Sequence, residues 1–367
     1  MKFTVNREVL LKPLQHVAGV VERRQTLPVL SNVLAVLDNN RLSLTGTDLE
    51  VELVANIPVE QEVGGEITIP AKKLLEICKS LPDSADLKFS QDDQKMVIKA
   101  GRSRFSLSTL PANDFPNLED GPGTQKFTIA QKKFKKLVER TSFAMAQQDV
   151  RYYLNGLLVE ISGSRFRCVA TDGHRLALSD CELENQSFDQ TTQVIVPRKG
   201  ILELARLMDQ SDDLVTVNVG TNHIKVEIDD ITFTSKLVDG KFPDYDRVLP
   251  KGGEISLVVD REEMKQALSR VSILSNEKYR GVRLTLGEGN LEIIANNPEQ
   301  EEAEENVAID YSGKEAEVGF NVAYLLDVMN VTKDEQIRMT LADSNSSALL
   351  EELENSDSMY VVMPMRL

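Results

Sequence analysis

The side chains in this sequence that come closest to an acid–base arrangement lie in the tract Thr171-Asp172-Gly173-His174-Arg175. Asp172 and His174 could exchange a proton, and Ser179 could act as a nucleophile, which would make the protein a hydrolase. Residues i and i+2 of a strand do point to the same face, but no third partner is identifiable from sequence. The similar tract Thr47-Asp48-Leu49-Glu50 lies 124 residues earlier. We therefore interpret both tracts as structural turns and expect no catalytic residues.

The other candidates for chemistry are an acidic run and three cysteines. Carboxylates between Glu299 and Glu305 could bind a metal ion, but the run lacks the glycine and the spacing of a calcium loop. Cys78, Cys168 and Cys181 are odd in number and lack zinc-ligand spacing. We expect reduced thiols, no metal site and no cofactor.

The chain repeats one tract three times, and this repetition indicates how its elements are organised. Residues 67–77, ITIPAKKLLEI, recur as 194–204, VIVPRKGILEL, and more loosely as 318–328, VGFNVAYLLDV. Pro70 precedes Pro197 by 127 residues, and Pro197 precedes the aligned Asn321 by 124. A period this long indicates three tandem domains, which we place at 1–124, 125–253 and 254–367.

Each repeat is predicted to contain two helices and roughly eight strands. Apolar residues recur at helical spacing over 7–21, 131–141 and 261–274, and again from the second half of each copy of the repeated tract. Proline is expected at the first helical position after Ile69 and after Val196. Alternating patterns between the helices predict strands, including a last one over 360–367. The fold class is therefore α+β, with helices on one face of largely antiparallel sheet.

The charge of the chain is acidic overall, whereas its predicted helices are basic. The 367 residues have a formal net charge of -16, which argues against a protein that coats nucleic acid non-specifically. Yet the helices expose lysine and arginine, as at Lys72, Lys132 and Lys199. The N-terminal residues lack the apolar core of a signal peptide, and no run reaches the roughly 20 apolar residues of a membrane span. We expect a soluble, cytoplasmic protein without a membrane partner.

Several segments, in their order and spacing, resemble the bacterial sliding clamps, the β subunits of DNA polymerase III. They are 105–111 FSLSTLP, 148–156 QDVRYYLNG, 170–176 ATDGHRL, 196–200 VPRKG, 242–245 FPDY, 275–278 SNEK, 295–302 ANNPEQEE and the tail 360–367. The resemblance covers the whole chain. It implies three tandem clamp domains, two protomers joined head to tail in a closed ring, helices lining the hole and sheets outside.

The resemblance implies that the ring encloses duplex DNA without reading its sequence. A Debye length of about 8 Å at physiological salt would keep acids on the outer sheets from repelling DNA on the axis. Lysine and arginine contact phosphates, so the ring could move along any sequence. Tyr152 and Tyr153 could instead be core aromatics. The DNA contacts implied by the resemblance are Arg24, Gln148, Arg151, Tyr152, Tyr153, Arg198 and Lys199.

The resemblance also implies a peptide pocket between repeats two and three. Apolar walls with flexible methionines would take leucine and phenylalanine of a Gln-Leu-x-Leu-Phe segment from polymerase and repair proteins. Asp246 and Asn345 depart from the usual pattern beside it. The residues implied are Leu154, Thr171, Gly173, His174, Arg175, Leu176, Pro243, Arg247, Val248, Tyr279, Asn321, Tyr324, Val361, Met363, Pro364, Met365 and Arg366.

We also expect a homodimer, a clamp loader as a partner and no enzyme activity. We call the contact between the two protomers the seam. We expect cations of repeat one to face acids of repeat three across the seam, with an apolar part between them. A hydrolase and a monomeric peptide-binding adaptor are the alternatives. The seam residues are Lys73, Arg102, Arg104, Phe105, Leu107, Ile273, Leu274, Glu299, Glu301, Glu302, Glu304 and Glu305.

Overall fold

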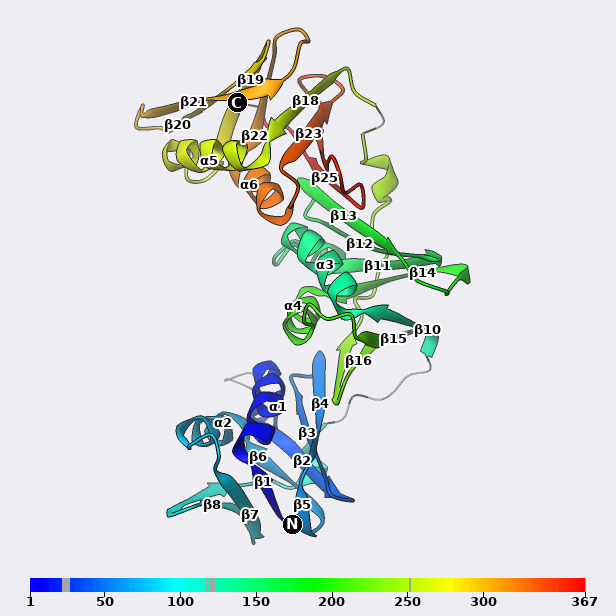
Figure 1. Cartoon of the computed structure of the whole chain (residues 1–367), viewed down its shortest axis with the longest axis vertical. Helices are drawn as coiled ribbons and strands as arrows, with labels where there is room; N and C mark the ends of the chain where they lie inside the picture. Colours follow the sequence, from blue (N-terminus) through cyan, green and yellow to red (C-terminus); the bar gives the residue numbers. More distant parts are fainter. Residues whose placement is uncertain (22–26, 117, 119–122, 251, 367) are drawn as a thin grey trace. The chain divides into compact units, whose positions relative to one another are not determined.

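The computed structural model describes residues 1–21, 27–116, 118, 123–250 and 252–366. Contacts within the chain divide it into two compact units, one of residues 1–132 and 199–237 and one of residues 133–198 and 238–367. Each unit has its own antiparallel sheets (Figure 1). Repeat two therefore contributes to both units.

The first unit contains two sheets and the helices α1 (Arg7–Val20) and α2 (Ala71–Ser80), which pack against each other. One sheet has the order β5 (Glu60–Val63), β1 (Lys2–Asn6), β7 (Asp86–Asp92), β8 (Lys95–Ala100) and β9 (Ser103–Ser108). The other has the order β10 (Gly123–Ala130), β15 (Leu214–Gly220), β16 (His223–Ile228), β17 (Ile231–Lys236), β4 (Val51–Pro58), β3 (Arg41–Thr47), β2 (Asn32–Asp38) and β6 (Gly65–Pro70).

The second unit contains a sheet of 12 strands and the helices α5 (Arg261–Val271) and α6 (Val322–Val331). The strand order is β14 (Phe188–Pro197), β11 (Gly156–Gly163), β12 (Arg165–Thr171), β13 (Arg175–Glu182), β25 (Ser358–Val362), β24 (Ala348–Glu352), β23 (Gln336–Leu341), β18 (Ile255–Asp260), β21 (Glu302–Asp310), β20 (Asn290–Asn296), β19 (Gly281–Gly287) and β22 (Ala316–Asn321). Unit boundaries fall inside α3 (Gln131–Thr141) and at the start of α4 (Arg198–Leu207).

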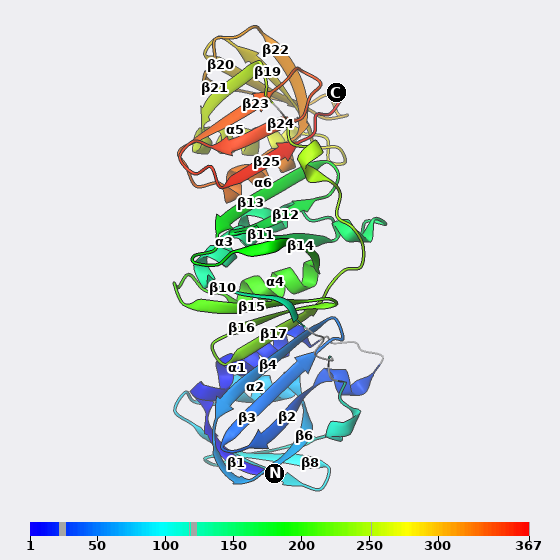
Figure 2. The ribbon, with the colours of Figure 1, turned by 90° about the vertical axis from the view of Figure 1, so that its right-hand side faces the viewer.

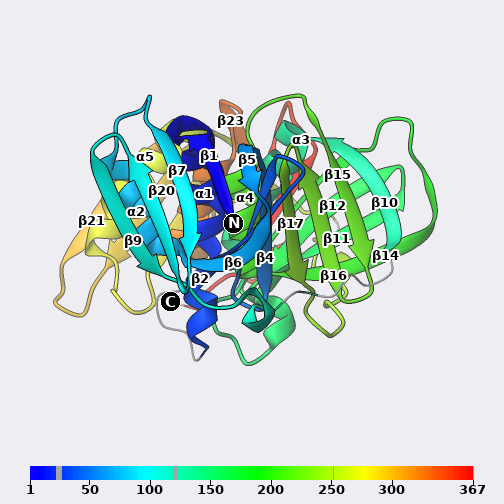
Figure 3. The ribbon, with the colours of Figure 1, turned by 90° about the horizontal axis from the view of Figure 1, so that it is seen from below.

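Strand pairs join neighbouring repeats into continuous sheets. Within the first unit, β17 of repeat two pairs with β4 of repeat one (Figure 3). Within the second unit, β13 of repeat two pairs with β25 of repeat three over Arg175–Ser179 and Ser358–Val362 (Figure 2). Because an unpaired edge strand exposes backbone donors and acceptors, each pairing satisfies two edges at once.

The helices begin where the sequence supplies a cap. Asn6, Asp260 and Asn321 accept backbone N–H hydrogen bonds from the first turns of α1, α5 and α6 at 3.0, 2.8 and 2.9 Å. Pro70 and Pro197 each stand one residue before the helix. The prediction of proline at the first helical position is therefore wrong by one residue, because each proline still belongs to the preceding strand.

Two further expectations about the elements need correction. The strand expected over 360–367 ends at Val362, since Pro364 cannot donate a ladder hydrogen bond. The helix expected over 261–274 ends at Val271 and continues as a single 3-10 turn, Ser272–Leu274. The other short 3-10 turns are Pro28–Ser31, Ala112–Asp114, Ser142–Ala144, Tyr152–Leu154 and Tyr245–Arg247.

A backbone bridge recurs at the same place in all three repeats. In each repeat, the residue two positions before the aligned Pro70, Pro197 or Asn321 forms a backbone hydrogen bond with the segment that follows the last strand of that repeat. Thr68 N donates to Leu110 O at 3.1 Å, Val238 N to Ile195 O at 2.8 Å, and Met365 N to Gly319 O at 2.8 Å. This repeat bridge gives the three copies one register, which allows their positions to be compared strand by strand.

Candidate functional site

The tract 171–175 forms a turn stabilised by its own side chains. Asp172 Oδ1 accepts hydrogen bonds from the backbone N of His174 and Arg175 at 2.9 and 3.0 Å, and Thr171 Oγ1 donates to Arg175 O at 2.6 Å. The tract 47–51 repeats this pattern: Asp48 Oδ1 accepts from Glu50 N and Val51 N, and Thr47 Oγ1 donates to Val51 O. The interpretation of both tracts as structural turns is confirmed.

The hydrolase alternative has no geometric support in the second unit. Ser179 is buried, and its Oγ lies 2.8 Å from Ser358 Oγ rather than next to a histidine. Asp172 Oδ2 accepts from Arg175 Nε at 3.1 Å, so both carboxylate oxygens serve the turn. Burial also raises the pKa of the Cys181 thiol to about 12, which leaves it protonated and unreactive near neutral pH.

Next to this turn lies a cavity of about 310 Å³, which we call the central pocket. Its walls are largely apolar, and polar groups stand at one side. Leu154, Leu176 and Val361 are buried in its floor, while Val248 and Met363 are about half exposed. The lining residues are Arg151, Tyr153, Leu154, Thr171, Gly173, Arg175, Leu176, Pro243, Tyr245, Val248, Val361 and Met363. Such a cavity suits apolar side chains of a short peptide.

Arg175 fixes the polar side of the central pocket. Its guanidinium pairs with Asp327 of α6 and donates to Phe143 O at 2.8 Å. The same group lies 4.5 Å from the Tyr324 ring centroid and 5.2 Å from that of Phe143. Ion pairs, a hydrogen bond and two aromatic faces thus hold one cation in place, so it is pre-oriented before any ligand arrives.

Tyr245 also lines the pocket, although the sequence interpretation did not include it. Its hydroxyl donates to Glu160 Oε1 at 3.0 Å and accepts from Arg167 NH1 at 3.1 Å. Burial raises its pKa to about 12, so it stays a neutral donor. The signal that could have indicated Tyr245 is its position in the segment 242–245 FPDY, two residues after Pro243.

Eight of the residues expected in the peptide site do not line the central pocket. His174 contributes its carbonyl, which accepts from Met363 N at 2.9 Å, and Asn321 caps α6. Tyr324 supports Arg175 from outside the cavity. Arg247 is exposed and pairs with Asp244 at 2.8 Å, and Pro364 lies in the tail beyond Met363. The other three, Tyr279, Met365 and Arg366, line a different cavity in repeat three.

Three of the seven residues expected to contact DNA are held by partners of their own chain. Arg151 makes a double contact with Asp149, at 3.0 and 2.8 Å, and these hydrogen bonds lower the pKa of Asp149 to about 2. Tyr152 is exposed. Gln148 is also exposed, and Tyr153 lines the central pocket. Arg198 NH1 donates to Ser142 O and Met145 O at 3.4 Å, and Lys199 pairs with Asp48. Arg24 lies outside the described residues.

Most of the residues expected at the dimer seam are exposed. Ile273 is 77% exposed, although it is apolar. Arg104 and Phe105 lie on β9, the last strand of its sheet. Glu305 is bound by Arg270 of its own repeat, at 2.5 and 2.9 Å. Arg102 and Lys73 are exposed, Leu274 is half-buried, Leu107 is buried, and Glu299, Glu301, Glu302 and Glu304 are exposed.

Taken together, the α-helices in the described part of the chain are basic although the chain is acidic, and α6 is the exception, with one Asp and no Lys or Arg. Together α1 to α6 contain 16 Lys and Arg residues but 7 Asp and Glu residues, a formal charge of +9 set against -16 for the whole chain. The strands and loops therefore hold the excess acid. Some of these cations are paired, as Lys132 is with Asp212 at 2.5 Å.

The described residues contain no cluster of three or more His, Cys, Asp or Glu side chains arranged to bind a metal ion. Their helices include none with the length and apolar character needed to cross a lipid bilayer.

The three matching repeats, the basic helices and the central pocket define a class of non-catalytic scaffold built from tandem α+β clamp domains. Sequence comparison agrees with this class. Residues 1–119, 128–244 and 246–366 match the N-terminal, central and C-terminal domains of the DNA polymerase III beta subunit.

The chain belongs to the DNA polymerase III beta subunit family, the beta sliding clamps. It is 62% identical to the beta sliding clamp of Pseudomonas aeruginosa and 52% identical to that of Escherichia coli K12, over the full length of each chain. A crystal structure of the Pseudomonas aeruginosa subunit superposes with a TM-score of 0.98 at 61% identity, with both chains covered completely. Another structure from that organism, bound to griselimycin, has a TM-score of 0.97 at 62% identity and full coverage.

Proposed function

We propose that two copies of this chain join head to tail into a ring that encloses duplex DNA and tethers the replicative polymerase to it. The observation that supports this proposal most directly is the formal charge of the six α-helices together, +9, in a chain whose formal net charge is -16. Cationic helices attract phosphates without reading bases, while acidic strands and loops limit sticking elsewhere. The same proposal divides the chain into three domains, residues 1–124, 125–253 and 254–367. It also includes a clamp loader as a partner and a cytoplasmic location.

We expect the loaded ring to stay on circular DNA and to leave DNA with free ends. Topological enclosure needs no tight contact, so retention should survive salt concentrations that abolish ordinary phosphate binding. The measurement is gel filtration of labelled protein after loading onto a nicked plasmid, before and after linearisation. Equal retention on both DNA forms would contradict enclosure and would indicate simple affinity.

We propose that the central pocket binds the short apolar segment of polymerases and repair proteins. Each leucine or phenylalanine side chain fully buried there would contribute about 1.5–3 kcal/mol before ordering costs. A single short peptide should therefore bind at roughly micromolar affinity, and two pockets per dimer would favour multivalent partners. The half-exposed Met363 supports this role, since its flexible side chain can adapt to different ligands.

Replacing Met363 by aspartate should weaken binding of a Gln-Leu-Ser-Leu-Phe peptide by about 10- to 100-fold. The reason is that the new carboxylate would have to be desolvated against the apolar ligand. Fluorescence anisotropy of the labelled peptide gives the Kd. Leu214→Asp is the matched control, because Leu214 is an exposed apolar residue far from the lining residues in sequence. Deleting residues 363–367 should also abolish binding yet leave a dimer, and unchanged affinity in both variants would refute the assignment.

A further inference from the structure

Leu49 has an unusual backbone conformation for an apolar residue. Its φ is 78°, in the left-handed region, and the other non-glycine residues of the described chain with a positive φ are all polar or charged. A leucine is disfavoured there because its Cβ crowds the backbone. Such strain persists only where the surrounding structure fixes the conformation, so the leucine side chain must gain stabilisation from its position.

The turn that contains Leu49 is the repeat-one copy of the turn beside the central pocket. Leu49 N donates to Thr47 Oγ1 at 3.0 Å, and Gly173 N donates to Thr171 Oγ1 at 3.1 Å. Gly173 also has a positive φ, of 89°. Leu49 therefore stands where repeat two has a glycine, which adopts this conformation without strain.

A strand of the following repeat is joined to both turns in the same way. Lys236 N donates to Glu50 O at 2.8 Å, and Met363 N donates to His174 O at 2.9 Å. Glu50 and His174 each follow the residue of positive φ. Lys236 thus occupies the place of Met363, which is a wall residue of the central pocket.

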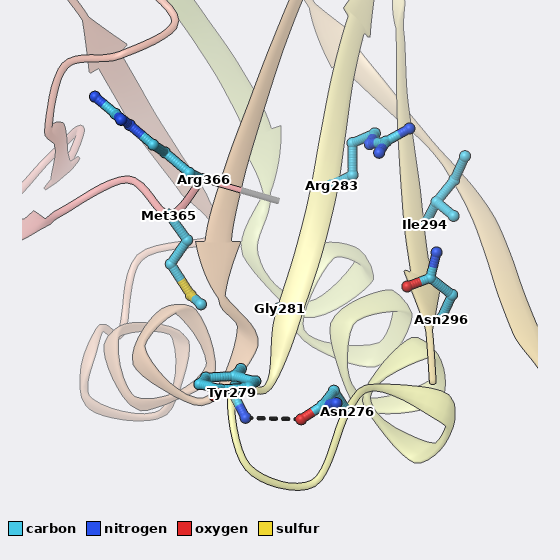
Figure 4. Close-up of a pocket in the computed structure, with 8 residues that line it drawn as sticks. All are labelled: Asn276, Tyr279, Gly281, Arg283, Ile294, Asn296, Met365 and Arg366. Atoms are coloured by element: carbon cyan, nitrogen blue, oxygen red, sulfur yellow. Dashed lines mark hydrogen bonds between the residues drawn. The ribbon is translucent and has the colours of Figure 1, made fainter. Parts of the chain in front are cut away.

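Repeats two and three both have a cavity at this turn. The volume of the central pocket is about 310 Å³, and that of the cavity in repeat three is about 400 Å³ (Figure 4). Thr171 lines the first cavity and Asn296 the second. Strand pairing places both residues in register with Thr47 of repeat one. Two of the three copies of this place in the fold therefore border a cavity.

In repeat one the side chain of Leu49 occupies this place. It packs against the apolar cluster that contains Val29 and Leu30. The register of β2 and β11 equates these two residues with Tyr153 and Leu154, which line the central pocket. Leu49 therefore lies on the surface that, in repeat two, forms the floor of the cavity.

The walls beside Leu49 indicate a smaller and more polar pocket than the central one. Glu52 pairs with Thr234 between repeats one and two, whereas Leu176 pairs with Val361 at the equivalent place between repeats two and three. Two apolar wall positions are thus polar, so the apolar surface here is chiefly the cluster beneath Leu49. Such a pocket suits one branched aliphatic side chain rather than the two apolar side chains of a Gln-Leu-x-Leu-Phe segment.

We propose that the boundary between repeats one and two contains a closed copy of the central pocket, which binds a leucine-type aliphatic side chain and holds Leu49 of the same chain as its occupant. We call this copy the closed pocket, formed by Val29, Leu30 and the turn 47–51. All of its residues belong to the first unit. Leu49 thereby limits each protomer to the apolar docking site of the second unit. This consequence for partner number rests on the proposed role of the central pocket, whereas the closed pocket itself does not.

Removing the occupant should let a small ligand take its place. N-acetyl-leucine methylamide, titrated into Leu49→Gly, should shift the Val29 and Leu30 methyl resonances saturably, with a Kd of about 10 mM for one buried leucine side chain. The native chain should bind this ligand there at least about tenfold more weakly, because Leu49 fills the site. N-acetyl-alanine methylamide should bind neither chain well, since it lacks the branched side chain. Leu214→Gly, at an exposed leucine of β15, is the control and should respond like the native chain.

The strain at Leu49 gives a second, independent measurement. Leu49→Gly should unfold at a higher urea concentration than Leu49→Ala, because alanine keeps the Cβ and glycine does not. At Leu214 the order should be reversed, since glycine in a strand loses more conformational entropy than alanine on folding. Leu49→Asn takes the place of Leu49→Gly in the ligand titration if the latter does not fold, because asparagine tolerates the left-handed region.

Three results would overturn the proposal. They are Val29 and Leu30 resonances that respond equally in the native chain and in Leu49→Gly, a Leu49→Ala variant at least as stable as Leu49→Gly, and loss of the folded state in both Leu49→Gly and Leu49→Asn. A Gln-Leu-Ser-Leu-Phe peptide that binds neither the native chain nor Leu49→Gly would instead refute the role of the central pocket. The leucine titration does not use that peptide, so the two failures are distinguishable.

Discussion

Replacing Arg140 by methionine is expected to lower the free energy of unfolding by about 3–5 kcal/mol, because it leaves a buried carboxylate without its counter-ion. The Arg140 and Glu352 side chains are 5% and 0% exposed, and Arg140 NH1 lies 2.7 Å from Glu352 Oε2. Among the described residues no hydrogen bond of suitable geometry reaches that oxygen, so the contact is ionic. The other oxygen, Oε1, accepts from Lys333 N and Asp334 N at 2.5 and 3.1 Å.

Lys136→Met is the matched control for this prediction. Lys136 lies one turn earlier on α3 and pairs with Asp357 at 2.7 Å, but both side chains are partly exposed. An exposed pair contributes about 1 kcal/mol or less. Urea unfolding at fixed protein concentration measures both variants. The double variant Arg140→Met, Glu352→Met should lose less than the sum of the single losses, and equal small losses for Arg140 and Lys136 would refute the buried pair's importance.

Replacing Ile273 and Leu274 by alanine is expected to convert the dimer into monomers. Ile273 is apolar and 77% exposed, and it lies next to half-buried Leu274 in the turn after α5. An exposed isoleucine gains stabilisation only if another surface covers it. Light scattering should give the protomer mass of 40.9 kDa for the variant and twice that mass for the native chain.

The control for this prediction is Leu214→Ala, since Leu214 is 67% exposed on β15 and lies outside the proposed seam. It should leave the dimer intact. Persistence of the dimer in the Ile273 and Leu274 variant would exclude this seam. A native chain that scatters as a single protomer at micromolar concentration would favour the monomeric peptide-binding adaptor instead.

The helices and most strands were predictable because their signals are local. Helical spacing gave α3 at its observed bounds, Gln131–Thr141. The turn at Thr171-Asp172 was predictable from its copy at Thr47-Asp48, since both use the same side-chain hydrogen bonds. The repeat period supplied the rest of the organisation.

The features that were not predictable depend on pairings between residues distant in sequence. Arg140 looks like another exposed cation of a basic helix, but its partners Glu352 and Asp357 lie more than 200 residues later. The strand pairing of β13 with β25 likewise joins segments from different repeats. Glu305, expected to face another protomer, is bound by Arg270 within its own repeat. Hydrophobic periodicity carries no information about any of these contacts.

The hydrogen-bonded ladder between β13 and β25 makes the third copy of the fold a structural requirement for the second. A fragment that stopped at residue 253 would leave five residues of β13, Arg175–Ser179, with bare backbone amides and carbonyls along a hydrophobic edge. Such an edge recruits strands from other molecules, and aggregation would compete with folding.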